Sequence, residues 1–195
     1  VKVDTGATIT TASGGRVFLL GGQVENAGSI ATPNGQTVLA AGSEVYLSSP
    51  TGGATPLYMS EANDKVPTVK GLLVEVNGAR TDAEFATNSG SISTPTGNAT
   101  IVGWAVNQMG RVSATTSVTQ NGSVYLLARS GTTDSGSTTK KATVGGTLTL
   151  GGGSTTTITP DTTPDASGQA VTTNANAVFT ASRIAMSGQA INLAS

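Results

Sequence analysis

Short apolar runs bounded by glycine recur along the chain, and polar residues alternate with apolar ones inside and beside them. Residues 15–21 (GRVFLLG) are matched twenty positions later by residues 35–41 (GQTVLAA), and further versions occupy residues 97–103 and 122–128. A period of two is typical of strands that turn one face to a core. The pattern therefore predicts many short β-strands.

A longer motif repeats as well. The pattern N-x-G-S-I-x-T-P-x-G lies at residues 26–35 and 88–97, with a looser copy at 108–115. The copies are offset by 62, 20 and 82 residues, which we interpret as three, one and four multiples of a unit of about 20 residues. Such a unit is too short for helical-hairpin repeats, and the leucine-rich repeat pattern is absent. The motif favours the laps of a parallel β-helix, about eight to nine of them in a rod of roughly 40 Å.

The predicted fold class is therefore all-β, with the whole chain, residues 1–195, forming a single β-helix segment. One lap buries almost nothing by itself, so stability must come from stacking on neighbouring laps. We expect Leu19, Leu39 and Ile101 to share one interior column.

Glycine and asparagine recur at fixed places in the motif. Gly28, Gly90 and Gly110 each stand one residue before Ser29, Ser91 and Arg111, where we expect a sharp corner with positive φ. Asn26 and Asn88 recur in register just before these corners. We expect them to stack as an amide ladder, a structural role that recurrence favours over a ligand site.

Two stretches, near residues 48–69 and 131–169, lack the repeat of about 20 residues. We predict that they are loop or β-excursion insertions. Proline and paired glycines break the first, and threonine, glycine and serine dominate the second. Residues 43–47 alternate and are assigned to the shaft. Residues 146–150 and 154–159 are assigned to an exposed excursion within the second insertion.

Composition removes several classes of chemistry. The chain has no cysteine and no histidine, so it has no disulfide, no thiolate and none of the commonest general base. Only 11% of residues are charged, the net charge is −1, and aromatics make up 4%. These values predict neither nucleic-acid binding nor attraction to an anionic membrane. No apolar run reaches the length of about 18 residues that a membrane helix needs, so we expect no direct membrane insertion.

Asp4-Thr5-Gly6 matches the active-site signature of retropepsin-like aspartic proteases. That chemistry needs two such aspartates sharing a proton, together with a lead-in strand that is largely missing before Asp4. The same residues also fit one shaft unit, which is the interpretation we favour.

A second acidic group lies at Glu75, Arg80, Asp82 and Glu84, on one predicted strand and turn. A β-helix polysaccharide lyase or hydrolase would need such a cluster on an exposed face. The acidic residues are otherwise dispersed, and we interpret this group as a solvated edge.

The remaining candidates favour structural roles. Calcium-binding nonapeptides and EF-hand loops are absent, and Gly151-Gly152-Gly153 is not followed by the residues of a phosphate loop. Lys140-Lys141 is an isolated basic pair that we place at a loop tip. Trp104, the only tryptophan, is assigned to a strand, where packing is favoured over a carbohydrate platform. We therefore expect no catalytic residue, no cofactor and no metal.

Over residues 14–47, 110–117 and 121–129 the chain resembles the shaft of filamentous-haemagglutinin-like exoproteins of two-partner secretion systems. The resemblance implies a right-handed parallel β-helix, export through an outer-membrane transporter, and a role in adhesion, aggregation or biofilm formation. The Asn-Pro-Asn-Gly motif of that family's secretion domain does not occur here. This segment is therefore expected to be shaft, and transporter recognition is not assigned to its residues.

The predicted function is that of a structural shaft in a secreted or surface-anchored bacterial adhesin, and not that of an enzyme. Its partners would be the transporter during export and an extracellular polysaccharide or a receptor on a host or bacterial surface. The regions 50–67 and 131–164 are the best candidates for binding. Three alternatives stay open: the shaft of a contact-dependent toxin, a carbohydrate-active β-helix enzyme, and a phage tailspike.

Overall fold

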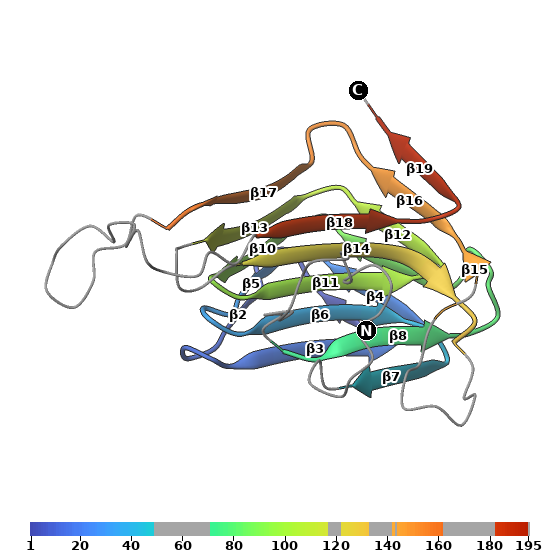
Figure 1. The fold of residues 1–195 in the computed structure, drawn as a ribbon, viewed down its shortest axis with the longest axis horizontal. Coiled ribbons are helices and arrows are strands. Elements are labelled where there is room, and N and C mark those ends of the chain that lie inside the picture. The colour runs from blue at the N-terminus through green and yellow to red at the C-terminus, as the bar shows by residue number, and fades with distance from the viewer. Residues whose placement is uncertain (49–70, 117–121, 133–141, 143, 162–181, 195) are drawn as a thin grey trace, which may run out of the picture.

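A computed structural model describes residues 1–48, 71–116, 122–132, 142, 144–161 and 182–194. In this part of the chain every regular element is a β-strand. The strands wind in laps around one axis, from the N-terminus at one end to the C-terminus at the other (Figure 1). Each lap contributes one strand to each of three parallel sheets, so the fold is a parallel β-helix.

The first sheet contains β1 (Lys2–Val3), β4 (Gln23–Asn26), β9 (Phe85–Asn88), β12 (Ala105–Gln108), β16 (Thr147–Leu150) and β19 (Ala190–Leu193). The second sheet contains β2 (Thr8–Thr10), β5 (Ser29–Ala31), β10 (Ser91–Pro95), β13 (Arg111–Thr116) and β17 (Thr155–Pro160). The third sheet contains β3 (Arg16–Gly21), β6 (Gln36–Ala41), β11 (Asn98–Gly103), β14 (Ser123–Ser130) and β18 (Arg183–Ser187).

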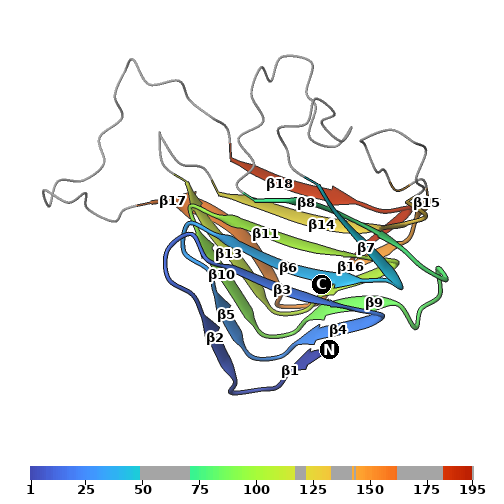
Figure 2. The ribbon, with the colours of Figure 1, turned by 90° about the horizontal axis from the view of Figure 1, so that it is seen from below.

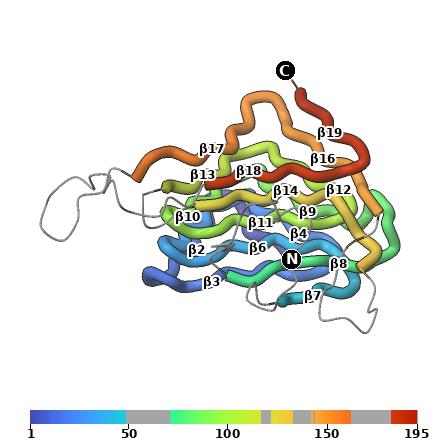
Figure 3. The backbone as a smooth tube through the Cα atoms, in the orientation of Figure 1, coloured from blue at the N-terminus to red at the C-terminus, as the bar shows by residue number. Residues whose placement is uncertain are grey.

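We number the laps by their strands. Lap 1 is β1–β3, lap 2 is β4–β6, lap 3 is β9–β11, lap 4 is β12–β14 and lap 5 is β16–β18; β19 begins a sixth. Figure 2 shows the laps lying over one another when the molecule is turned, and Figure 3 follows the same winding as a tube. The stacking of short parallel strands is what the short alternating runs predict.

The interior column is confirmed. Leu19 pairs with Leu39, Leu39 with Ile101, and Ile101 with Leu126, all in parallel register in the third sheet. Leu39, Ile101 and Leu126 are fully buried in one core cluster, and Leu19 packs against it. Each such buried side chain contributes about 1.5–3 kcal/mol through removal of apolar surface from water.

The expected number of laps is wrong. Asn26 pairs directly with Asn88, so the 62-residue offset is one lap and not three. Asn88 pairs with Gln108 twenty residues on, which is the true length of an uninterrupted lap. The described residues therefore form five laps and the start of a sixth, which at about 4.8 Å per lap gives a stack of roughly 24 Å. Dividing the chain length by the repeat length overestimated the rod because the insertions do not wind.

The first insertion is a β-excursion, one of the two forms that we expected, but it begins before residue 48. Its described part is an antiparallel hairpin of β7 (Glu44–Ser48) and β8 (Leu73–Asn77), which we call the side hairpin. Residues 43–47, assigned above to the shaft, thus belong to the hairpin, and residues 49–70 lie outside the described residues. Instead of bulging away, the hairpin packs on the outer face of the third sheet through one apolar cluster. The cluster contains Phe18, Val38, Ala40, Val45, Leu73, Val74, Val76, Val102, Tyr125, Leu127 and Ala185.

The described part of the second predicted insertion is mostly shaft. β16 pairs in parallel with β12, and β17 pairs in parallel with β13, so the threonine-rich stretches form lap 5. Leu148 is fully buried in the main core. Threonine favours strands, and the alternation Thr-Leu-Thr-Leu puts leucine inside. Within the described residues, β15 (Val144–Gly145) departs from the shaft, because it pairs antiparallel with β14. The rest of the predicted insertion, residues 133–141, 143 and 162–169, lies outside the described residues.

Candidate functional site

The amide ladder predicted at Asn26 and Asn88 is present at the end of the first-sheet strands. The Asn26 Nδ2 donates to Asn88 Oδ1 at 2.8 Å, and Asn88 Nδ2 donates to Gln108 Oε1 at 2.8 Å. All three side chains are fully buried. Gln108 was missed as a rung because its extra methylene hides the likeness to asparagine, although it stands at the same place in the looser motif copy.

Each rung also holds the corner above it. The Asn88 amide donates to the Arg111 carbonyl oxygen at 3.2 Å, and the Gln108 amide donates to the Thr155 carbonyl oxygen at 3.0 Å. These carbonyls belong to the next lap, just beyond its corner. The ladder therefore ties successive laps together by buried hydrogen bonds to both side chains and backbone, and its chemistry is structural.

The expected positive φ at the corner glycines is wrong. The positive-φ glycines of the described chain are Gly6, Gly14, Gly71, Gly131 and Gly153. Gly90 is needed for a different reason, since a Cβ there would lie 2.1 Å from the Gly28 carbonyl oxygen. Gly110 meets the Gly90 oxygen at the same 2.1 Å. The laps approach so closely at this corner that only glycine fits between them.

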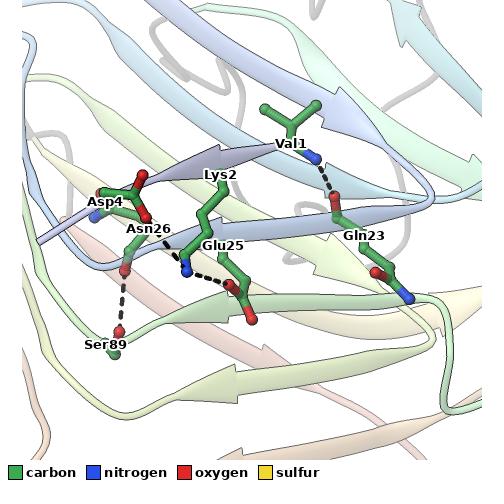
Figure 4. A network of polar contacts seen from close by, with 7 residues as sticks. All are labelled: Val1, Lys2, Asp4, Gln23, Glu25, Asn26 and Ser89. Carbon is green, nitrogen blue, oxygen red and sulfur yellow. Dashed lines mark hydrogen bonds and ion pairs between the residues drawn. The ribbon is translucent and has the colours of Figure 1, made fainter.

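Exposed ion pairs gather at the N-terminal end (Figure 4). The Lys2 ammonium lies 3.3 Å from Asp4 and 3.8 Å from Glu25. Close by, the terminal ammonium of Val1 donates to the Gln23 carbonyl oxygen at 2.7 Å. Because the Lys2, Asp4 and Glu25 side chains are 57%, 79% and 40% exposed, their pairs contribute little stability, of the order of 0–1 kcal/mol.

The protease-like motif lies in an exposed turn of lap 1. The Ala7 amide donates to the Asp4 carbonyl oxygen at 3.0 Å, and Gly6 has a φ of 84°. The charged neighbour of the Asp4 carboxylate is Lys2, not a second aspartate that could share its proton. Asp4 therefore has the surroundings of a corner residue, as the shaft interpretation predicts.

Glu75 does not lie on the solvated edge that we expected for its group. Glu75 is 2% exposed and forms a buried ion pair with Arg129 of β14. The pair lies where the side hairpin meets the third sheet, and the long separation of 54 residues hid it from sequence reasoning. A carboxylate buried against a guanidinium is closed off from a large substrate such as a polysaccharide.

The rest of that group stays at the surface. Arg80 has a φ of 57°, and its amide donates to the Glu84 carboxylate at 3.0 Å. Asp82 is exposed, as is Arg80. Glu84 thus stabilises the left-handed turn that leads from the side hairpin back to lap 3, and the four residues do not converge on one site.

The pKa of Glu44 is clearly shifted. A hydrogen bond from the Asn77 side chain, and a second from the Tyr46 hydroxyl, lower the pKa of this exposed carboxyl below its usual value. A lowered folded-state pKa means that this stabilisation is present above the ordinary value of 4.5 and is lost as the pH falls through the folded value. All three groups lie within the side hairpin, so this pH dependence is local to it.

The other singled-out residues occupy corners. Trp104 is half-buried at the bend between β11 and β12, not inside a strand, and its carbonyl oxygen accepts from the Thr147 amide at 3.1 Å. Gly151-Gly152-Gly153 forms the turn between β16 and β17, closed by the Ser154 amide on the Gly151 oxygen at 3.0 Å. Lys140 and Lys141 lie outside the described residues. So does the whole of the first predicted binding region, 50–67, and so do residues 133–141, 143 and 162–164 of the second.

The outer face of the second sheet offers the most regular exposed surface. Inward Ile30, Ile92 and Val112 are fully buried, whereas the alternate positions face outward. The outward hydroxyl positions, half-buried or exposed, are Thr8, Thr10, Ser29, Ser91, Ser93, Ser113, Thr115, Thr155, Thr157 and Thr159. Their hydroxyls repeat at the strand spacing, so this face can donate and accept hydrogen bonds along the rod.

Within the described residues, no cluster of three or more acidic side chains is arranged to hold a metal ion. A search of the same residues found no helix able to cross a bilayer. Comparison with protein-family models, with curated proteins and with solved structures found no match.

Proposed function

We propose that this chain is a stretch of rigid shaft in a secreted or surface-anchored bacterial adhesin, which mediates contact between cells or with a surface and supports biofilm formation. The sequence supports this through the resemblance of residues 14–47, 110–117 and 121–129 to filamentous-haemagglutinin-like shafts. The part of that resemblance at 43–47 falls in the side hairpin, so laps 1, 2 and 4 carry it.

The observation that carries the proposal is the continuity of the stack across its first insertion. Lap 3 returns to lap 2 in register, and the Asn26–Asn88–Gln108 ladder passes the insertion unbroken. Buried hydrogen bonds and a continuous core resist bending between laps, which is the property required of a shaft that holds a binding region away from a cell. The hydroxyl face of the second sheet is the described surface we propose for contacts with a polysaccharide or a surface receptor. Export through an outer-membrane two-partner transporter is part of the same proposal.

Antibodies raised against the purified chain test the location. We expect them to label intact cells of the source bacterium, and to lose that label when the gene for the outer-membrane transporter is deleted. Fab fragments of these antibodies should reduce cell aggregation and attachment. Label that appears only after permeabilisation would contradict the proposal.

Purified chain immobilised on beads tests the activity. We expect retention of an extracellular polysaccharide or of whole cells without any shortening of the polysaccharide. Release of shortened sugars, abolished by Asp82→Asn or Glu84→Gln, would favour the carbohydrate-active enzyme instead.

A further inference from the structure

The side hairpin makes contacts that an ordinary lap cannot make. A lap of a solenoid touches only the laps directly above and below it, and solenoid stability is close to a sum of such nearest-neighbour terms. β8, in contrast, lies against β6, β11 and β14, which belong to laps 2, 3 and 4. The hairpin therefore connects laps that do not touch each other.

One buried side chain of lap 2 makes two hydrogen bonds to the hairpin segment. Gln36, in β6, accepts from the Leu72 amide at 2.8 Å and donates to the Leu72 carbonyl oxygen at 2.7 Å. Gln36 is fully buried and Leu72 is half-buried, so both bonds are partly shielded from water. The backbone just before β8 is thus held to lap 2 at both of its polar groups.

Its attachment to lap 4 is equally direct. Glu75 is paired with Arg129 at the end of β14, and the hydroxyl of Thr132 donates to the Val76 carbonyl oxygen at 2.8 Å. Between the two attachments, Val74 and Val76 pack in the apolar cluster with side chains of laps 2, 3 and 4. Opening lap 4 away from lap 2 would expose this cluster and separate Arg129 from the Glu75 carboxylate.

We propose that the side hairpin is a clasp that makes laps 2, 3 and 4 open as one cooperative unit. It supplies a link between second-nearest neighbours, which stacking alone lacks. This inference goes beyond the shaft proposal and does not depend on what the shaft binds.

Native-state hydrogen exchange with peptide resolution tests the clasp. Val112→Ala weakens lap 4 from inside the second sheet, remote from the hairpin. With the clasp intact, we expect the amides of β6 in lap 2 to exchange faster by about the same factor as those of β14. In a Glu75→Gln background, Val112→Ala should still speed amide exchange in β14. The factor by which it speeds amide exchange in β6 should be about tenfold smaller than with the clasp intact.

Glu44→Gln is the matched control. It makes the same chemical change in the same hairpin, on an exposed side chain whose hydrogen bonds to Tyr46 and Asn77 stay within the hairpin. It should leave the response of β6 to Val112→Ala unchanged. If exchange within β8 shows that Glu75→Gln has not released the hairpin, Val76→Lys opens it instead, with Leu47→Lys as its exposed control. The proposal is overturned if Val112→Ala does not change amide exchange in β6 in the intact chain. It is also overturned if Val112→Ala speeds that exchange by the same factor after β8 is released.

Discussion

Single residues at the corners decide how closely the laps can stack. The corner before the third sheet is a four-residue turn, closed by the Gly35 amide on the Thr32 oxygen in lap 2 and by the Gly97 amide on the Thr94 oxygen in lap 3. The third residue of this turn is left-handed, with a φ of 54° at Asn34 but 51° at Thr96. Asparagine tolerates this conformation, whereas a β-branched residue is strained in it. The two laps therefore form the same turn with different backbone strain.

Exchanging these two residues tests that cost. Thr96→Asn should raise stability by about 0.5–1 kcal/mol, because it relieves left-handed strain at a site that is already covered. Asn34→Thr, in the neighbouring lap, should lower stability by a similar amount. Urea and thermal unfolding of both variants measure the effect, and a shift of the same sign in both would refute the argument.

The close approach at the first corner predicts a large effect from one methyl group. Gly90→Ala should cost about 3 kcal/mol or prevent folding, because the new Cβ would overlap the Gly28 carbonyl oxygen of lap 2. Gly22→Ala is the control, since a Cβ added at Gly22 would meet nothing within 4 Å and the φ of Gly22 is not positive. It should be neutral or slightly stabilising, by up to about 1 kcal/mol, in the same unfolding measurements. Equal effects of the two substitutions would show that backbone freedom, and not close approach, selects glycine at position 90.

At the scale of elements, the shaft strands could be predicted from the sequence and the side hairpin could not. Leu39 and Ile101 reveal their neighbours because each strand repeats the apolar spacing of the one it pairs with. A hairpin strand such as β7 alternates in the same way, so its pattern does not say whether its partner is parallel or antiparallel. The Glu75–Arg129 pair depends on how the hairpin folds back, which no local repeat encodes. The composition of threonine-rich β17 suggests an excursion, and only its register with β13 identifies it as a shaft strand.

The ladder should hold the first sheet together more than its outward polar groups do. Asn88→Ala removes the middle rung and leaves the Asn26 amide and the Gln108 oxygen without their side-chain partners, which should cost about 3 kcal/mol. Asn107→Ala, one position earlier than a rung, removes only a half-buried bond of 3.2 Å to Thr87 and should cost about 1 kcal/mol or less. Chemical denaturation of both variants makes the comparison. A loss at Asn107 as large as that at Asn88 would contradict a special role for the ladder.

The whole molecule has two unlike ends. At the N-terminal end Val3 and Val17 are largely covered, and with Ile30 they form a small core cluster. At the C-terminal end Ile184, Met186, Ile191 and Leu193 stand at inward positions and are 38–73% exposed. An open sheet edge with apolar side chains is a template for further strands.

This difference predicts how the chain behaves alone in solution. We expect its average mass to rise with concentration through contacts at the C-terminal end, as measured by sedimentation. Ile191→Lys combined with Leu193→Lys should suppress the association by placing charge on that edge. Leu47→Lys, at an exposed position on the outer strand of the side hairpin, should not. If Leu47→Lys suppresses the association and the double variant at Ile191 and Leu193 does not, the chain associates through the side hairpin instead.

The passage from the third sheet back to the first varies from lap to lap, whereas the passage at the glycine corner stays short. Gly22 alone makes it after lap 1 and Trp104 alone after lap 3, but residues 42–84 intervene after lap 2 and residues 131–146 after lap 4. The strand register is kept across both insertions. The rod therefore has sites that accept insertions along one edge, after every second lap and about 10 Å apart. Foreign peptides grafted there could be displayed in a line without disturbing the winding beneath them.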